Sequence, residues 1–290
     1  MKKRIFYALS RRGYLNLLSD KIYLKWMYWA TFNKKLNLKN PKTFNEKLQW
    51  LKLFDRKDEY TKMSDKYLVR DYIKETIGEE YLIPCLGVYE NFDEIPFDSL
   101  PNQFVIKCNH DSGGVIICTD KNTFDFELAK RKINMCLKKN YYYGGREWPY
   151  KNIQPRIIIE KYMCENNESM IDYKFFCMNG EPRFLYVSQG LENHATAQIS
   201  FLTMDYKLAP FKRKDYRGFD EIPKKPFMYE KMQELAMILS KNIPFVRVDF
   251  YEINKKIYFG ELTFYPCSGC IPFDPEEYDE ILGKELIIKK

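Results

Sequence analysis

Four polar residues near the end of the chain have the types and spacing of a reactive site. Arg247 and Asp249 lie in the strand-like run VRVDFYEI, and Glu261 and Thr263 lie in KIYFGELTFYP. If the two runs form a hairpin with Asp249 opposite Glu261, all four side chains share one face, because side chains alternate along a strand. Opposed carboxylates repel unless a cation neutralises them. Carboxylate oxygens favour Mg²⁺ or Mn²⁺, so the pattern predicts a metal site completed by phosphate oxygens, with Arg247 stabilising negative charge.

This register depends on the connection between the two runs. A three-residue loop of residues 254–256 pairs Ile253 with Ile257, and continuing from that pair places Arg247 opposite Thr263. The alternative is an exposed sheet face on which the charges are unrelated to one another. The flanking apolar residues favour a buried site.

A second candidate segment begins at Phe104 and reads FVIKCNHDSGGVIIC. It predicts two short strands, with Lys107 near the end of the first and a glycine-rich turn between them. Backbone N–H groups of Ser112, Gly113 and Gly114 would then cover phosphates, with Lys107 as the counter-charge. A Walker A loop is excluded because no Gly-Lys-Ser/Thr sequence opens a helix here. A plain turn is the alternative.

The run IIIEKYM, which ends at Met163, is apolar and β-branched up to the carboxylate of Glu160. A strand that becomes polar in this way forms a slot for a flat base, whose edge is read by backbone groups. On the following strand, Asp172 and Lys174 share a face because they alternate with aromatic residues. The alternative is that these two charges simply face solvent.

The elements that must position these residues are helices and strands in comparable amounts. Helices are expected in residues 5–32 as one or two amphipathic segments, then up to about residue 54 from a capping box at Thr43, and in 66–77, 125–140 and 229–241. Strands are expected mostly in hairpins, one of them closed by Asn179-Gly180. Residues 189–228 show no pattern that assigns an element. The expected fold class is therefore α+β (α/β) with mainly antiparallel sheets.

The positive charge is concentrated at the start of the chain. Residues 1–42 hold eleven Lys or Arg and one Asp, a local net of +10 within a total of +7, which leaves the rest of the 290 residues mildly acidic. This distribution excludes a protein that wraps nucleic acid with its whole surface. Mixed aromatic and basic residues predict a helical segment that lies on an anionic membrane, or one that docks on its own domain.

The eight cysteines indicate a reducing compartment. Several lie in apolar runs, and Arg11 and Arg12 interrupt the first apolar stretch, so no signal peptide is evident. No apolar run approaches the roughly 18 residues of a membrane span. Cys267 and Cys270 form a lone CxxC without a second ligand pair, which disfavours zinc. We expect a cytoplasmic protein, peripheral to the inner face of the membrane if residues 1–42 bind lipid.

Together these pieces resemble the ATP-grasp superfamily, and specifically its TupA-like members, of the teichuronopeptide-biosynthesis type. The resemblance covers most of residues 43–285, and the blocks that carry it are FNEKLQWLK, SDKYLVRDYI, FVIKCNHDSGG, REWPYKNIQPRIIIEKYM, DYKFFCMNGEPRF and FVRVDFY with YFGELTFYPCSG. It implies two lobes that grip ATP between antiparallel sheets. The implied divisions are a basic helical segment (1–42), an N-terminal lobe (43–100), a central lobe with the glycine-rich flap (101–165) and a C-terminal lobe with the metal site (166–290).

The resemblance also implies a role for each site residue. Lys107 and Lys174 would contact ATP phosphates, Glu160, Lys161, Tyr162 and Met163 would lie along adenine, and Asp172 would contact ribose. Asp249 and Glu261 would bind Mg²⁺ or Mn²⁺, and Ser268 and Gly269 would hold the acceptor. Thr263 stands where related ligases have an asparagine ligand, and Thr coordinates metal more weakly.

The implied chemistry is ligation of a carboxylate to an amine, with Arg247, Lys107 and Lys174 as the catalytic cations. The carboxylate, borne by a sugar or polysaccharide precursor, attacks ATP to give an acyl phosphate, and an amine donor then forms the amide. The expected pathway is bacterial surface polysaccharide biosynthesis (capsule, O-antigen or teichuronic-type polymer). The alternatives are a glycosyltransferase or an ATP-grasp kinase in that pathway, or a non-catalytic nucleotide-binding scaffold. The chemistry needs no side-chain nucleophile, and the only histidines are His110, a possible base in the flap, and His194.

Overall fold

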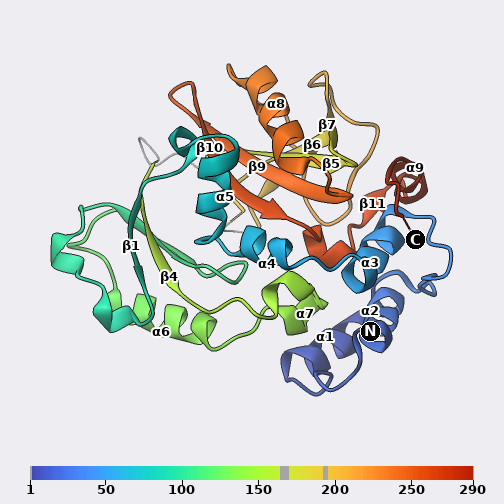
Figure 1. Ribbon diagram of the computed structural model, residues 1–290, viewed down its shortest axis with the longest axis horizontal. Helices are drawn as coiled ribbons and strands as arrows, with labels where there is room; N and C mark the ends of the chain where they lie inside the picture. Colours follow the sequence, from blue (N-terminus) through green and yellow to red (C-terminus); the bar gives the residue numbers. More distant parts are fainter. Residues whose placement is uncertain (1, 164–169, 192–194, 290) are drawn as a thin grey trace.

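The computed structural model describes residues 2–163, 170–191 and 195–289. Two antiparallel sheets lie on opposite sides of the molecule, with helices between and around them (Figure 1). The four-stranded sheet has the order β1-β4-β2-β3, the five-stranded sheet the order β10-β9-β5-β6-β7, and β8 and β11 form a small third sheet. The expectation of an α+β fold with mainly antiparallel sheets is confirmed.

The strands and helices have the following bounds. The strands are β1 Cys85–Tyr89, β2 Phe104–Cys108, β3 Val115–Cys118, β4 Ile157–Lys161, β5 Asp172–Met178, β6 Glu181–Gln189, β7 Gln198–Thr203, β8 Lys212–Arg213, β9 Phe245–Ile253, β10 Lys256–Thr263 and β11 Phe273–Asp274. The α-helices are α1 Lys2–Arg11, α2 Asp20–Phe32, α3 Phe44–Phe54, α4 Asp58–Ser64, α5 Val69–Thr76, α6 Phe126–Leu137, α7 Tyr142–Gly145, α8 Tyr229–Ser240 and α9 Tyr278–Glu285.

The hairpin of β9 and β10 corrects the expected register. Its turn has two residues, Asn254 and Lys255, with φ values of 52° and 59°, so that Lys256 pairs with Ile253. The expected three-residue loop is wrong because two left-handed residues close the turn whose twist matches the strands. A bulge between Phe259 and Leu262 then adds one residue to β10. The bulge restores the expected pairing of Arg247 with Thr263.

Most of the expected helices and turns are confirmed. Thr43 caps α3 in a full capping box, Asp125 caps α6, and Asn179-Gly180 closes the β5–β6 hairpin. The expected helix 66–77 begins later, at Val69. Ser64 ends α4. The Asp65 carboxylate then accepts from the backbone N–H groups of Tyr67 and Leu68, which forms a separate turn before α5.

The stretch without a sequence pattern contains the edge strand β7 and the short strand β8. β7 completes the five-stranded sheet by pairing with β6 along its whole length. Its residues 199–202 are all buried, so the strand lacks the alternation by which a half-exposed strand is recognised. β8 has two residues and is held by β11, more than 50 residues later in the chain.

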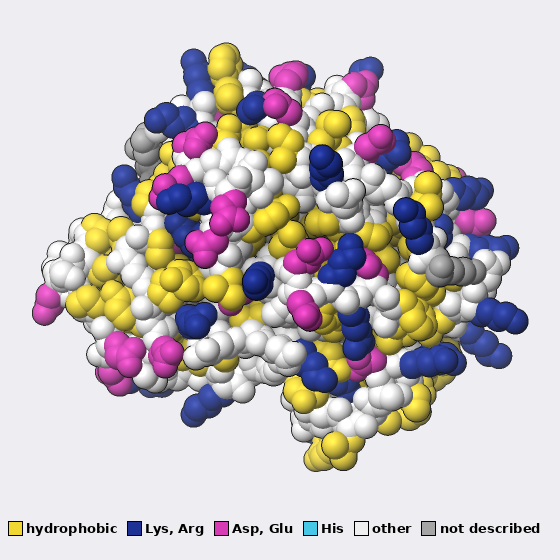
Figure 2. All heavy atoms as spheres, in the orientation of Figure 1, with side chains coloured by type: hydrophobic (Ala, Val, Ile, Leu, Met, Phe, Trp, Pro, Cys, Tyr) yellow, Lys and Arg dark blue, Asp and Glu magenta, His cyan; other side chains and the backbone are white. Residues whose placement is uncertain are grey.

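The basic segment 1–42 docks on its own domain. Tyr23, Leu24 and Met27 of α2 are fully buried in a separate small core, which also includes Cys270. Other side chains of the segment stay exposed, Trp26 and Trp29 among them, and Figure 2 shows hydrophobic side chains gathered where α1 and α2 lie in Figure 1. Among the described helices, none is long and apolar enough to cross a bilayer.

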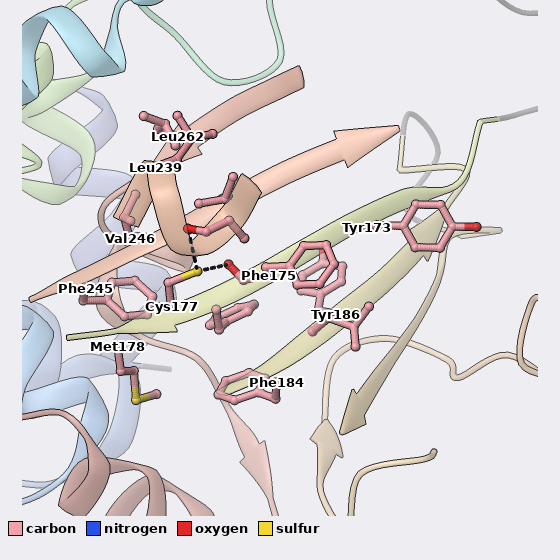
Figure 3. Packing of buried hydrophobic residues seen from close by; sticks show 14 of the residues in the cluster. Tyr173, Phe175, Cys177, Met178, Phe184, Tyr186, Leu239, Phe245, Val246 and Leu262 are labelled. Atoms are coloured by element: carbon pink, nitrogen blue, oxygen red, sulfur yellow. Dashed lines mark hydrogen bonds between the residues drawn. The ribbon is translucent and has the colours of Figure 1, made fainter. Parts of the chain in front are cut away.

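The largest core belongs to the five-stranded sheet and the helices packed on it. Figure 3 shows Cys177 of β5 pointing toward α8, on the side of Leu239 and Val246, while Met178 points to the opposite side with Phe184. The thiol of Cys177 donates to the carbonyl oxygen of Ala236 in α8 at 3.8 Å. A smaller core covers the four-stranded sheet with α6.

These cores divide the chain differently from the expected lobes. Helices α3, α4 and α5 pack into the core of the five-stranded sheet, whereas β1 and residues 92–100 belong to the four-stranded sheet and its core. The molecule thus has two halves, one built on the four-stranded sheet and one on the five-stranded sheet. The expected N-terminal lobe, residues 43–100, is shared between them. The expected boundary at residues 165 and 166 lies outside the described residues.

Candidate active site

A cluster of six polar side chains lies on one face of the five-stranded sheet, and we name it the sheet cluster. Each of three strands contributes two members: Asp172 and Lys174 from β5, Arg247 and Asp249 from β9, and Glu261 and Thr263 from β10. The register places Lys174 directly beside Asp249, and Arg247 directly beside Thr263. In the view of Figure 2, acidic and basic side chains lie close together near the middle of the molecule.

Asp249 is the fully buried centre of the sheet cluster. Its Oδ1 accepts from Arg247 Nε at 2.7 Å, and its Oδ2 accepts from Arg247 Nη2 at 2.6 Å and from Lys174 Nζ at 2.8 Å. Two side-chain cations therefore neutralise the carboxylate inside the protein. Such a bidentate, charge-assisted contact also fixes the plane of the guanidinium.

Glu261 lies at the exposed edge of the same cluster, with 38% of its side chain accessible. Its Oε1 accepts from Arg247 Nη2 at 2.9 Å and from the Thr263 hydroxyl at 3.0 Å. Partial desolvation alone would raise the pKa of Glu261, but Arg247, Lys66 and Lys174 outweigh it and lower the pKa to about 2. The carboxylate is thus ionised at any physiological pH.

The donor set of the sheet cluster fits a hard divalent cation. Asp249 and Glu261 offer carboxylate oxygens, and Thr263 adds a hydroxyl that accepts from Arg247 Nη2 at 2.9 Å. In this structure the repulsion between the two carboxylates is relieved by Arg247, which bonds both of them. A bound metal would have to share these oxygens with the guanidinium.

Lys174 and Asp172 extend the cluster along β5. Lys174 Nζ donates to Asp172 Oδ1 at 2.9 Å, and the Ser188 hydroxyl donates to Asp172 Oδ2 at 3.3 Å. Burial disfavours the ammonium, but Asp172 and Asp249 raise the pKa of Lys174 well above its usual value. Lys174 therefore carries a fixed positive charge beside Asp249.

Lys107 and Glu160 meet on the four-stranded sheet. Lys107 Nζ lies 2.6 Å from Glu160 Oε2, and Arg70 Nη1 lies 3.7 Å from Glu160 Oε1. The carboxylate expected along adenine therefore neutralises the lysine expected on phosphates in this structure. Beyond Glu160, Lys161 is exposed, and Tyr162 and Met163 are partly buried at the end of β4.

The glycine-rich turn joins β2 and β3 as expected, with Lys107 paired to Val115. Ser112 and Gly113 are exposed at its tip, and Gly113 has a φ of 108°, a conformation that side-chain-bearing residues rarely adopt. Gly114 is buried beneath them. The turn therefore presents backbone to any molecule that lies against its tip.

Two basic residues that the sequence analysis did not single out connect the halves. Lys66 donates to the carbonyl of Asp111 in the flap and also lowers the pKa of Glu261, and Arg70 reaches Glu160. Lys66 precedes α5 and Arg70 lies in its first turn, four residues later. This basic i,i+4 pair was the only local signal.

The turn Pro266–Gly269 contains the expected acceptor residues. Cys267 and Ser268 both have φ of 53° and Gly269 has φ of 64°. Left-handed backbone costs a non-glycine residue about 1–2 kcal/mol, so the neighbours must hold the turn. Gln49 Nε2 donates to the carbonyl of Gly269 at 2.6 Å, and Lys52 Nζ donates to that of Ser268 at 2.7 Å.

Glu147 and Lys52 complete this second cluster, which we name the turn cluster (Gln49, Lys52, Glu147 and Ser268). The Ser268 hydroxyl donates to Glu147 Oε1 at 2.8 Å. Burial raises the pKa of Glu147 and lowers the pKa of Lys52 to about 8. Sequence reasoning did not single out Gln49, Lys52 and Glu147, because they lie more than 100 residues from the turn.

The remaining candidates have structural surroundings. His110 is buried, with its Nε2 3.1 Å from the carbonyl oxygen of Lys139, so the ring supports the base of the flap. Cys267 and Cys270 are free thiols. Cys108, Asp111 and Cys136 bring three ligand atoms together at the flap, but burial raises the pKa of Cys108 to about 12 and favours its neutral thiol. Cys164 and His194 lie outside the described residues.

Two antiparallel sheets, one with a lysine beside a glycine-rich hairpin and the other with an Arg-x-Asp strand beside a glutamate strand, define a protein of the ATP-grasp class. The chain belongs to the TupA-like ATP-grasp family, whose model matches residues 46–287. The basic segment 1–42 precedes the matched region.

Similar solved structures include D-alanine–D-alanine ligases. The Helicobacter pylori enzyme is 16% identical, with a TM-score of 0.43 over 84% of this chain and 69% of its own. The Bacillus anthracis enzyme is 17% identical, with a TM-score of 0.39 over 70% of this chain and 57% of its own. Cdc123 from Schizosaccharomyces pombe is 8% identical, with a TM-score of 0.42 over 73% and 87%. This chain thus spans little more than half of the Bacillus ligase. None of the curated proteins matches it.

Proposed function

We propose that the protein is an ATP-dependent ligase that joins a carboxylate to an amine through an acyl phosphate. The observation that carries the proposal is the sheet cluster, in which Arg247 bonds both Asp249 and Glu261 while Lys174 bonds Asp249. This arrangement concentrates fixed cations beside carboxylates at the edge of a sheet. Family membership supports ATP as the co-substrate.

The proposed nucleotide contacts follow from the charges of both halves. Lys107 would leave its ion pair with Glu160 and bind phosphate oxygens of ATP instead. The exposed tip at Ser112 and Gly113 would offer backbone N–H groups to the same phosphates. Glu160–Met163 would lie along adenine, and Asp172 would accept from a ribose hydroxyl. Asp249 and Glu261, with Thr263 as a weaker third ligand, would hold Mg²⁺ or Mn²⁺, which supplies neutralisation of the polyphosphate charge.

The reaction would use these residues for positioning and charge stabilisation. A carboxylate oxygen of the acceptor attacks the γ-phosphorus, the bond to the β-phosphate oxygen breaks, and ADP leaves. The free amine then attacks the acyl carbon, the carbon–oxygen bond to phosphate breaks, and the nitrogen loses a proton to solvent. Lys107 and Lys174 would hold phosphoryl oxygens, and Arg247 would stabilise the tetrahedral oxyanion. The turn at Ser268 and Gly269 would orient the acceptor.

We further propose that the acceptor is a carboxylate-bearing sugar or polysaccharide precursor of the bacterial surface, modified on the cytoplasmic side. The exposed face of the basic segment supports a membrane-proximal enzyme. Ile5, Leu9, Trp26 and Trp29 line an apolar groove of ≈ 670 Å³ with Lys25 and Lys35 at its sides. Each Lys or Arg near anionic lipid contributes about 1 kcal/mol. Co-sedimentation with vesicles with and without anionic lipid tests this part.

The test of the ligase is a product assay with matched carboxylate variants. ADP and phosphate should form in equal amounts with an amide only when ATP, a uronic acid and an amine are all present. Asp249→Asn and Glu261→Gln should each lower turnover by at least about a hundredfold, the effect of losing one electrostatic group from such a site. Asp220→Asn is the control, since that carboxylate pairs with Arg217 on the surface.

Circular dichroism of each variant separates loss of chemistry from loss of folding. Full ligase activity in folded Asp249→Asn and Glu261→Gln would overturn the assignment of the site. A phosphorylated sugar without amide would identify a kinase instead. Preference for a sugar nucleotide over ATP would identify a glycosyltransferase, and a lack of ATP turnover with every acceptor would identify a nucleotide-binding scaffold.

A further inference from the structure

A polar cavity of ≈ 400 Å³ lies between the basic segment and the turn Pro266–Gly269. We name it the Arg213 cavity. Lys3 and Lys34 line it from the basic segment, and Arg213, Lys214, Cys267 and Glu276 line it from the C-terminal half. Its size is within the range of small-molecule sites, and its lining mixes charged groups with the rings of Tyr7, Phe32 and Phe273. Such a mixture suits a ligand rich in hydroxyl groups.

The charges of the cavity leave a cation in excess. Lys34 and Lys214 share one carboxylate, Glu276, at 3.2 and 3.0 Å. Arg213 is largely buried and pairs with Asp215 at 2.6 Å. Asp279 also lines the cavity, where burial raises its pKa. With Lys3 included, four cations face three carboxylates, so one further negative charge would balance the site.

Cys267 connects this cavity to the proposed reaction centre. Arg213 Nη1 lies 3.1 Å from its sulfur. Cys267 is exposed as a residue, but desolvation of its sulfur raises the pKa of the thiol, and both Arg213 and Arg247 oppose that rise. The sulfur therefore lies within electrostatic reach of one guanidinium from the cavity and one from the sheet cluster. Ser268, the next residue, belongs to the turn cluster, where its hydroxyl donates to Glu147.

The strained turn Pro266–Gly269 orients the side chains that connect the Arg213 cavity with the turn cluster. Two consecutive non-glycine residues, Cys267 and Ser268, are left-handed, and α3 holds them through Gln49 and Lys52. Strain that the surroundings hold in place is typical of functional sites. Here it turns the thiol toward Arg213 while the hydroxyl of the next residue turns toward Glu147.

We propose that the Arg213 cavity binds the body of the acceptor, a sugar-sized anion that carries a second negative charge besides its reacting carboxylate. The inference rests on the proposed function and adds the place where the acceptor's body binds and its second negative charge. Hydroxyl groups would bond the lysines and carboxylates of the lining, and Lys3 would neutralise the second charge. The basic segment, outside the family match, would thus form one wall of the acceptor site.

The experiment compares two probes, glucuronic acid and glucuronic acid 1-phosphate, whose dissociation constants are measured by calorimetry without turnover. The phosphorylated sugar should bind at least about tenfold more tightly to the unmodified protein, and this advantage should vanish in Lys3→Glu. Arg4→Glu is the matched control, because it changes the net charge equally from an exposed residue next in the chain. Equal affinities for the two probes, or equal effects of the two substitutions, would overturn the proposal.

A second measurement locates the probe. Cys267 is an exposed free thiol, and its alkylation by iodoacetamide can be followed by peptide mass spectrometry. Glucuronic acid 1-phosphate should slow labelling of Cys267, and Arg213→Gln should abolish this protection. Unchanged labelling with bound probe would place the ligand elsewhere and overturn the proposal. Because both readouts are independent of turnover, Lys3-dependent binding without ligase activity would refute the proposed function but leave the cavity assignment standing.

Discussion

The sheet cluster and the turn cluster each surround a buried carboxylate, but they are built in different ways. Asp249 receives three hydrogen bonds from side-chain cations, all of them on its own or the adjacent strand. Glu147 receives one from a serine hydroxyl, and its nearest strong cation, Lys52, bonds two backbone carbonyls instead. The first carboxylate is paired directly with two side-chain cations, whereas the second lacks such a pair and burial raises its pKa.

This difference suggests different tasks for the two clusters: the sheet cluster supplies fixed charge, and the turn cluster positions a substrate. Cations that face Asp249 and Glu261 are committed to negative groups, which suits the binding of phosphates or a metal beside them. Lys52 and Gln49 are committed to the carbonyl oxygens of a strained turn, which suits the placing of a substrate against Ser268. The two clusters should therefore respond differently to loss of a cation.

The largest effect is expected from Arg247→Met. This change leaves Asp249 buried with Lys174 as its remaining side-chain cation, and breaking a buried ion pair costs about 3–5 kcal/mol. We expect the free energy of unfolding, measured by urea denaturation with circular dichroism, to fall by that amount.

The control for that variant is Arg183→Met, on strand β6 of the same sheet. Its guanidinium pairs with Glu181 at the surface, so the expected change is below about 0.5 kcal/mol. A loss of less than about 1 kcal/mol in Arg247→Met would show that the sheet cluster is not the electrostatic centre of the sheet.

An intermediate effect is expected in the pH dependence that Lys52 contributes. Burial lowers its pKa in the folded protein to about 8, below the value of about 10.4 in the unfolded chain, so the unfolded state binds this proton more tightly. Stability should therefore rise with pH above about 8, by roughly 1.5 kcal/mol between about pH 8 and about pH 9.5. Lys52→Met should remove that rise in chemical denaturation curves.

Lys47→Met is the comparison for Lys52, because this second lysine of α3 is also bonded to two carbonyls but is less buried. Its removal should change the pH profile less than Lys52→Met. If the unmodified protein and Lys52→Met have parallel profiles over this range, Lys52 is not a buried ammonium and the comparison of the clusters fails.

The smallest effect is expected from Ser268→Ala. The variant loses one hydrogen bond to Glu147, which is worth about 1 kcal/mol of stability, and the acceptor KM should rise while the KM for ATP stays unchanged. Ser99→Ala, whose hydroxyl bonds a surface carbonyl, is the control in thermal and kinetic assays. A raised KM for ATP instead would assign Ser268 to the nucleotide side.

Contacts between residues that are close in the chain were predictable from the sequence, and contacts between distant residues were not. Arg247, Asp249, Glu261 and Thr263 were placed on one face because alternation in a hairpin fixes the side of every residue. Even there, the turn was assigned the wrong length, and a bulge that no local pattern marked restored the pairing of Arg247 with Thr263. β7 was missed because a strand buried on both faces lacks alternation.

The order of the amino acids is enough to predict the antiparallel hairpins, the capped helices, the family resemblance and the charge of residues 1–42. Each of these depends on residues that are close in the chain or on composition. Other contacts are seen only in the folded chain: Lys107 meets Glu160, Lys52 and Glu147 reach the turn at Ser268, and Lys3 and Arg213 line one cavity. The physical reason is that these contacts arise from the packing of separate elements, and the periodicity of one element carries no information about which others it meets.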